Sequence, residues 1–177
     1  YRALCKLSGS GDEPFGAPGD EPAQGPALPF ASLRPGGGRA ADDELSSKLL
    51  SLALLLHVLE HPGPAFKSGP AFVRATRQHL CVALLKNATS AHMQVVALSL
   101  RIFVALLAHF KAHLKAEIEV FISTIFLKIV DSEYSTAEQK ELVLAVLEGL
   151  CDDWQGLVEL FVNYDCGGLD DQDLFRR

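Results

Sequence analysis

The sequence has few cysteines, and they are not arranged as a disulfide framework or a paired metal motif. Only four occur among the 177 residues, at long and irregular intervals and without a CxxC pair: Cys5, Cys81, Cys151 and Cys166. Three of them lie within apolar helical patterns. Cysteines of this kind are typical of buried free thiols in a reducing compartment, and this is the state that we predict for them.

The sequence also lacks a long apolar run and an excess of positive charge. Its longest nearly apolar stretch, residues 49–59, is interrupted by Ser51 and His57. A membrane-spanning helix needs about 20 residues, so no span is expected. Lys and Arg number 16 against 22 Asp and Glu, which gives a net charge of −6. Proteins that bind nucleic acid usually carry a basic face, so nucleic acid is not an expected partner.

Motifs that mark common catalytic and cofactor sites are missing as well. The sequence contains neither a phosphate-binding GxxxxGK[ST] or GxGxxG loop nor a GxSxG nucleophile elbow. His109 and His113 have a spacing that can hold a metal, but Phe110 stands where the zincin motif needs Glu. We therefore expect no cofactor and no resident metal. A metal-dependent enzyme built on these two histidines is retained as a third hypothesis.

Composition divides the chain into three parts. Residues 1–7 are typical of the end of a preceding helix. In residues 8–43, 14 of 36 positions are Gly or Pro. A segment of this composition buries too little apolar surface to offset its ordering entropy, which predicts a disordered linker. Residues 44–177 carry helical periodicity throughout and are the predicted folded domain.

Helical patterns in this domain follow one another at regular distances. Expected helices cover residues 43–60, 70–86, 91–110, 113–131 and 136 to about 166, with breakers such as Pro62 and Pro64 between them. Alternate helices begin about 45 residues apart, which is the period of HEAT and armadillo repeats. The prediction is an all-α, HEAT/armadillo-like helical repeat array whose stacked pairs share one core.

The last helix is the most informative. Ser135 and Glu138 fit a capping box at its start. An apolar stripe follows and is expected to face the core, so truncation of any predicted core residue should destabilise the fold; these residues include Leu98, Phe103, Phe121, Ile125, Leu147 and Trp154. The same stripe leads on to Asp165. Either this carboxylate is buried and paired, or the helix frays and leaves it in water.

Asn163, Tyr164, Asp165 and Cys166 resemble the HUS box, N-(Y/F)-D-C-D, which lies upstream of the Sec-seven catalytic domain in large Arf guanine-nucleotide exchange factors. The resemblance extends to other ordered blocks and covers most of the chain outside the linker. These blocks are residues 1–8, which are similar to the start of that region in the BIG-type subfamily, and residues 48–52, 80–87 and 114–121. Gly167 stands where the motif has its last Asp, which puts the strength of the box in doubt.

The resemblance implies a regulatory role without catalysis. In this family the HUS region packs with a neighbouring DCB domain, and the box is associated with that contact. The pair influences recruitment to Golgi and trans-Golgi network membranes, and the orientation of the catalytic domain that acts on Arf-family GTPases. The expected partner is therefore a DCB-type domain of the same or another chain, with Arf proteins engaged through the full-length protein. The expected location is cytoplasmic, peripheral on Golgi membranes.

Two further expectations concern a basic cluster and an alternative function for the chain. Lys111, His113 and Lys115 form a basic cluster that is a candidate for electrostatic contact with an acidic partner or lipid headgroups, unless it is only a solvated loop. The alternative to the regulatory module is a generic α-solenoid scaffold or adaptor of another family. Its concave helix faces would then bind the partner, and substitutions in the box would be silent.

Overall fold

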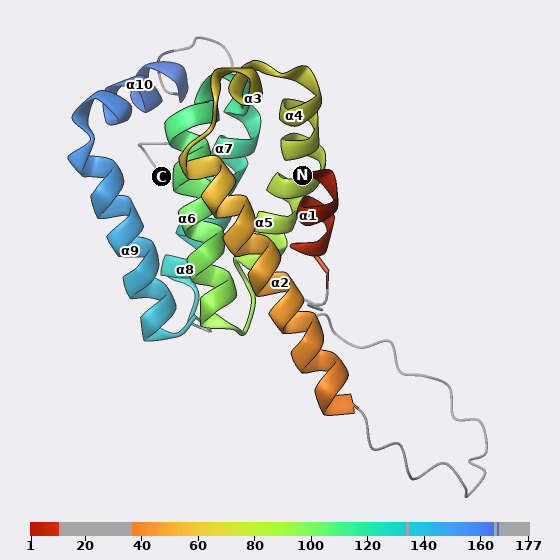
Figure 1. Ribbon diagram of the computed structural model, residues 1–177. Coiled ribbons are helices and arrows are strands. Elements are labelled where there is room, and N and C mark those ends of the chain that lie inside the picture. Colours follow the sequence, from red (N-terminus) through yellow and green to blue (C-terminus); the bar gives the residue numbers. More distant parts are fainter. Residues whose placement is uncertain (11–36, 134, 165, 167–177) are drawn as a thin grey trace, which may run out of the picture.

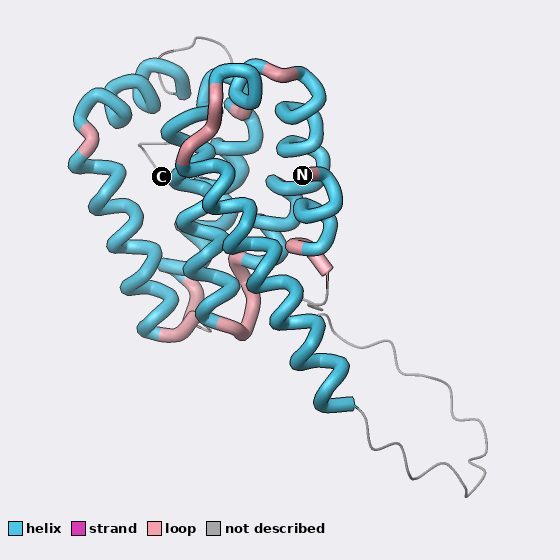
Figure 2. Tube along the Cα trace, in the orientation of Figure 1, coloured by secondary structure: helices cyan, strands magenta, loops and turns pink. Residues whose placement is uncertain are grey.

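The computed structural model describes residues 1–10, 37–133, 135–164 and 166, and the regular structure in these ranges is helical, without a strand (Figures 1 and 2). This confirms the predicted all-α class. The elements are α1 (Arg2–Leu7), α2 (Gly37–Glu60), α3 (Pro64–Ser68), α4 (Pro70–Ala75), η1 (Thr76–Cys81), α5 (Val82–Asn87), α6 (Met93–Phe110), η2 (Lys111–His113), α7 (Lys115–Phe121), η3 (Ile122–Phe126), α8 (Leu127–Asp131), α9 (Ala137–Asp152) and α10 (Trp154–Tyr164).

Two of the expected helices are each interrupted by a π-helical segment. The rod over residues 70–87 consists of α4, η1 and α5, and the rod over residues 115–131 consists of α7, η3 and α8. Each π-helical segment widens the turn to i→i+5 hydrogen bonds without ending the rod. Apolar periodicity predicted both rods but gives no signal for such a segment.

The long helix α6 lies in the centre of the fold. It contacts α2, α5 and α9, and Figure 1 shows it between α2 and α9. Together with η2 it covers Met93–His113, which in the described ranges is the one helix long and apolar enough, by length and composition, to cross a membrane. More than half of it is buried against the other helices. The expectation that no such stretch exists was based on residues 49–59 and overlooked this one.

Aromatic rings link α6 to the rod that follows it. Phe103 stacks on Phe121 with ring centroids 4.1 Å apart, and Phe126 packs edge-on against both. Ile125 is also buried, so the core assignment of Phe103, Phe121 and Ile125 is confirmed. Trp154 is 73% exposed, and its assignment to the core is therefore wrong.

Helix boundaries differ from the expected ones at both ends of the domain. Helix α2 begins at Gly37, so residues 37–43 of the expected linker are helical. Residues 8–10 of that linker are also described, and Ser8 is buried against the domain, whereas residues 11–36 lie outside the described residues. The predicted last helix is two helices, α9 and α10, which are separated at Asp153.

The capping box at the start of α9 is displaced by one residue from the predicted pair. The Thr136 hydroxyl accepts a hydrogen bond from the Gln139 backbone N–H at 3.2 Å, and the Gln139 side chain accepts one from the Thr136 N–H at 3.0 Å. The expectation for Ser135 and Glu138 is therefore wrong. Both pairs satisfy the sequence pattern, and the backbone conformation at Thr136 (φ −68°, ψ 156°) selects between them.

Candidate interaction surface on the last helix

Helix α10 begins with a local cap that breaks the rod of α9. The Asp153 carboxylate accepts a hydrogen bond from the Gly156 backbone N–H at 3.0 Å, as an N-cap side chain does. A Cβ atom at Gly156 would overlap with Asp153 Oδ2, so glycine leaves the space that this carboxylate occupies. The chain turns at Asp153 (φ −84°, ψ 79°), and α10 lies at an angle to α9 (Figure 1).

Contacts of Leu160 and Glu159 help to hold α10 against the rest of the domain. Leu160 is 9% exposed and belongs to the core, whereas Glu159 forms an ion pair with Lys111 at the end of α6. Both side chains of the pair are more than a third exposed, so the pair contributes little to stability. Its effect is on position, because it ties α10 to η2.

The other face of α10 is apolar and open to solvent. Trp154, Val158 and Phe161 are 73%, 55% and 46% exposed, and Val162 beside them is 54% exposed. The spacing of the first three places them on one face of the helix. We call these four residues the α10 face. The part of the predicted stripe that lies on α10 is thus directed outward at these positions, whereas Val143 and Leu147 on α9 pack in or against the core.

The four HUS-box residues lie at and just beyond the end of this helix. Asn163 and Tyr164 are the last residues of α10, and their side chains are outside what the structure describes. Cys166 is exposed and carries a free thiol. Asp165 and Gly167 lie outside the described residues, so both interpretations of the Asp165 carboxylate remain predictions.

The expected basic cluster is brought close to acidic partners. Lys111 pairs with Glu159, as described above, and His113 and Lys115 are exposed on either side of Leu114. Lys111 is therefore already engaged by a carboxylate within the domain.

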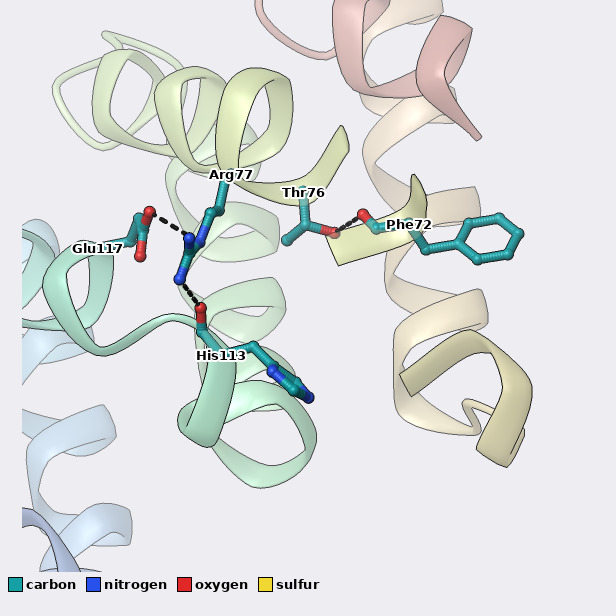
Figure 3. A network of polar contacts seen from close by, with 5 residues as sticks. All are labelled: Phe72, Thr76, Arg77, His113 and Glu117. Atoms are coloured by element: carbon teal, nitrogen blue, oxygen red, sulfur yellow. Dashed lines mark hydrogen bonds and ion pairs between the residues drawn. The ribbon is translucent and has the colours of Figure 1, made fainter. Parts of the chain in front are cut away.

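Sequence reasoning missed Arg77 of η1, which binds two residues near the basic cluster, Glu117 and His113. Its guanidinium pairs with Glu117 through Nε at 3.3 Å and donates a hydrogen bond to the backbone carbonyl of His113 (Figure 3). Arg77 and Glu117 lie 40 positions apart in the sequence, so neither periodicity nor a local motif signals this contact.

An apolar cavity of about 290 Å³ opens beside this ion pair. Arg77 and Glu117 contribute to its lining, and Glu117 Oε2 is buried there without a hydrogen-bond partner. The remaining walls come mainly from aliphatic and aromatic side chains of η1, α5, α6 and α7, which include Cys81, Leu84, Leu106, Ile118 and Phe121. The cavity is thus an apolar recess with a single polar edge.

The buried thiols lie on the opposite side of the domain from α10. Cys5 on α1 and Cys81 on η1 are both buried, and burial raises the pKa of Cys5 to about 11 and that of Cys81 to about 12. The prediction of buried free thiols is confirmed for these two residues. It is wrong for Cys151 and Cys166, which are exposed.

Among the described residues, no group of three or more His, Cys, Asp or Glu side chains is placed to hold a metal ion. The two histidines of the third hypothesis have no such companion there.

Comparison with known proteins identifies relatives along the whole chain. The family described as Mon2/Sec7/BIG1-like, HUS domain matches residues 31–169. The brefeldin A-inhibited guanine nucleotide-exchange protein 1 of Rattus norvegicus and that of Homo sapiens are each 46% identical over 177 residues. Brefeldin A-inhibited guanine nucleotide-exchange protein 2 of Arabidopsis thaliana is 37% identical over 178 residues.

Each of these matches covers 100% of the chain but only 8% or 9% of the relative. The chain therefore corresponds to a small part of proteins that are more than ten times as long. The family match extends over most of the helical domain and includes α10 and the HUS-box residues. On this basis the chain belongs to the Mon2/Sec7/BIG1-like family, in which it represents the HUS domain.

Proposed function

We propose that the chain is a non-catalytic regulatory and protein-interaction module of a large Arf guanine-nucleotide exchange factor, and that it binds a DCB-type domain through the α10 face and the HUS box. The observation that carries this proposal is the apolar surface of α10, which ends at Asn163 and Tyr164. An exposed apolar surface that includes tryptophan is typical of a protein–protein contact. The relatives, which are named as guanine nucleotide-exchange proteins, support the family role.

The geometry favours a helical or groove-shaped partner. Trp154, Val158 and Phe161 follow one another at i, i+4 and i+7, which is the pattern of anchors that an amphipathic helix inserts into a partner's groove. Binding by this surface would cover apolar area that the domain itself leaves in water. The HUS-box residues would then lie at the edge of the contact, where Tyr164 and Asp165 supply polar groups.

In the full-length protein, this contact would set how the regulatory part of the molecule is placed relative to the catalytic domain. We infer that the module thereby influences recruitment to Golgi and trans-Golgi network membranes and exchange activity toward Arf-family GTPases. The helix order is compatible with a HEAT/armadillo-like array. The basic residues His113 and Lys115 are exposed and are candidates for a weak contact with an acidic partner or with lipid headgroups.

The direct test is binding of the purified chain to the DCB segment of its own full-length protein. We expect Tyr164→Ala and Asp165→Ala to weaken binding at least tenfold while the circular dichroism spectrum stays unchanged. The matched control is Val82→Ala, because Val82 is 47% exposed but lies on α5, away from α10. If the folded box variants bind as the wild type does, the box is not part of the contact.

The same assay distinguishes the generic scaffold. In that case the box variants would be silent, and a substitution on another helix face would reduce binding instead.

A further inference from the structure

The first helix, α1, packs into the domain. It is separated in sequence from α2 by residues 11–36, which lie outside the described ranges. Helix α1 contacts α2 and η1, and Figure 1 shows it beside them. It also precedes the family-matched range, which begins at residue 31. We propose that the surface between α2 and the rod over residues 70–87 is a helix-binding groove, that residues 1–10 of the same chain are its ligand, and that binding does not require an intact connection through residues 11–36.

The amino-terminal end of this ligand is held by aromatic contacts. The Tyr1 ring meets those of Phe66 and Phe72 edge-on, at centroid distances of 5.0 and 5.9 Å. Its hydroxyl lies 2.7 Å from Thr76 Oγ1. The Thr76 hydroxyl also donates to the Phe72 carbonyl (Figure 3), so the Tyr1 hydroxyl joins a chain of polar contacts that reaches the backbone of α4. The groove therefore recognises an aromatic ring that carries a hydroxyl group.

Positions 5 and 9 of the ligand lie close against the groove. Cys5 is 1% exposed, and it lies one turn beyond Tyr1 on the same face. One turn further, a Cβ atom at Gly9 would lie only 3.0 Å from the Cβ of Ala83 on α5. A larger residue at position 9 would push the segment away from α5.

A buried hydrogen bond fixes the carboxyl-terminal end. Asn87 Nδ2 donates to the Ser8 carbonyl at 2.7 Å, and both residues are fully buried. The Ser8 hydroxyl turns back and donates to the Cys5 carbonyl at 2.9 Å, so the polar groups of Ser8 are satisfied inside the interface. Separating α1 from the groove would break this buried hydrogen bond and expose the Asn87 amide to water.

These contacts define what the groove accepts. The residues facing it are Tyr1, Leu4, Cys5 and Ser8, at i, i+3, i+4 and i+7, which is the spacing by which grooves read one face of a helix. Lys6 and Leu7 are exposed on the other side, whereas Arg2 is exposed at the edge and donates a hydrogen bond to His79 Nε2 of η1 at 3.0 Å. The ligand is thus an amphipathic helical segment in which a hydroxylated aromatic residue is followed by a buried small residue four positions later and by Ser-Gly after a further turn. The proposal involves a different surface from the α10 face and stands independently of the proposed function.

The experiment that tests this proposal starts from the whole folded chain. A recognition sequence for a site-specific protease is placed within residues 11–36, the folded protein is cleaved, and the products are separated by size-exclusion chromatography. We expect the amino-terminal fragment to remain with the domain at the mass of one chain. Immediate separation of the fragment overturns the proposal. A species of two chains whose fragments are exchanged would place the helix on a second copy and overturn the intrachain assignment.

Affinity is measured by displacement of the cleaved fragment with a fluorescently labelled synthetic peptide of residues 1–10. Peptides carrying Gly9→Val or Tyr1→Ala should bind at least tenfold more weakly, whereas the Lys6→Ala peptide, which differs only on the exposed side, should bind as the wild type does. Because these substitutions are in the peptide, they cannot unfold the domain. Equal affinity of all four peptides would show that binding is not specific and would also contradict the proposal.

Discussion

The rings of Phe103 on α6 and Phe121 on α7 are stacked almost parallel, with an interplanar angle of 10° and centroids 4.1 Å apart. The stack joins the central helix to the rod that follows it, and both side chains are nearly inaccessible to water. Removal of either ring would leave a cavity in the core, because the neighbouring rods cannot close around it.

Phe103→Ala should therefore lower the free energy of unfolding by about 3–5 kcal/mol. The measurement is urea denaturation followed by circular dichroism. Val104→Ala is the matched control, since Val104 is the next residue on α6 but is 37% exposed, and its effect should stay below about 1 kcal/mol. A loss at Phe103 no larger than that at Val104 would contradict the packing described for this helix.

The start of α9 gives a test of the capping residue. Thr136→Ala removes the hydroxyl that accepts the Gln139 N–H and should cost about 1 kcal/mol of stability. Ser135→Ala, one residue earlier, should change the unfolding midpoint little. The opposite ranking of the two variants would favour the capping box that sequence alone predicted over the one in the structure.

The four thiols should fall into two classes of reactivity. Cys151 and Cys166 are exposed and should react with Ellman's reagent in the native protein, whereas Cys5 and Cys81 should react only after denaturation, because they are buried and their raised pKa values keep them protonated. The number of thiols titrated before and after addition of urea measures this. Rapid reaction of all four in the native state would show that α1 does not stay packed on η1.

Stability should fall at alkaline pH because of the same two buried thiols. Their folded pKa values, about 11 for Cys5 and about 12 for Cys81, lie above the value of about 8.5 for an unfolded cysteine. As the pH rises above about 8.5, the unfolded chain therefore loses these protons first and is favoured. Their stabilising contribution is complete below that pH and is lost as the pH approaches 11–12.

The urea midpoint at pH 7.5 and pH 10 measures this loss. The difference between the two midpoints should shrink in a Cys5→Ala, Cys81→Ala double variant and should be unchanged in Cys151→Ala, whose thiol is exposed. An equal alkaline loss in all three proteins would assign the effect to other groups.

Much of the fold could be predicted from the sequence because its helices are amphipathic and are separated by strong breakers. The rods over residues 70–86 and 113–131, and the central helix to Phe110, follow directly from apolar periodicity and prolines. Periodicity shows that a helix has an apolar face, but it does not show what covers that face. For this reason the stripe through Trp154 and Phe161 was assigned to the core, although in the structure it is exposed.

The features that sequence analysis does not predict are of two kinds, one local and one long-range. Asp153 followed by Gly156 is a helix start that could have been recognised, because an Asp N-cap accepts from an N–H three residues on. The contact of Arg77 with Glu117, and that of Asn87 with Ser8, join residues far apart in sequence and depend on how the rods stack. The HUS-box tetrapeptide was recognised by resemblance, and its geometry at Asp165 is still a prediction.

Binding of the α10 face to a DCB-type domain is the central claim, and isothermal titration calorimetry with Trp154→Ala tests it most directly. We predict at least a tenfold loss of affinity for the DCB segment with no change in the unfolding midpoint, because Trp154 is 73% exposed in the free domain. The control is Leu50→Ala on α2, because the Leu50 side chain is 62% exposed but does not belong to the α10 face. This variant should bind the DCB segment as the wild type does. Unchanged affinity in the folded Trp154 variant, or a loss of stability in place of a loss of binding, would contradict the account.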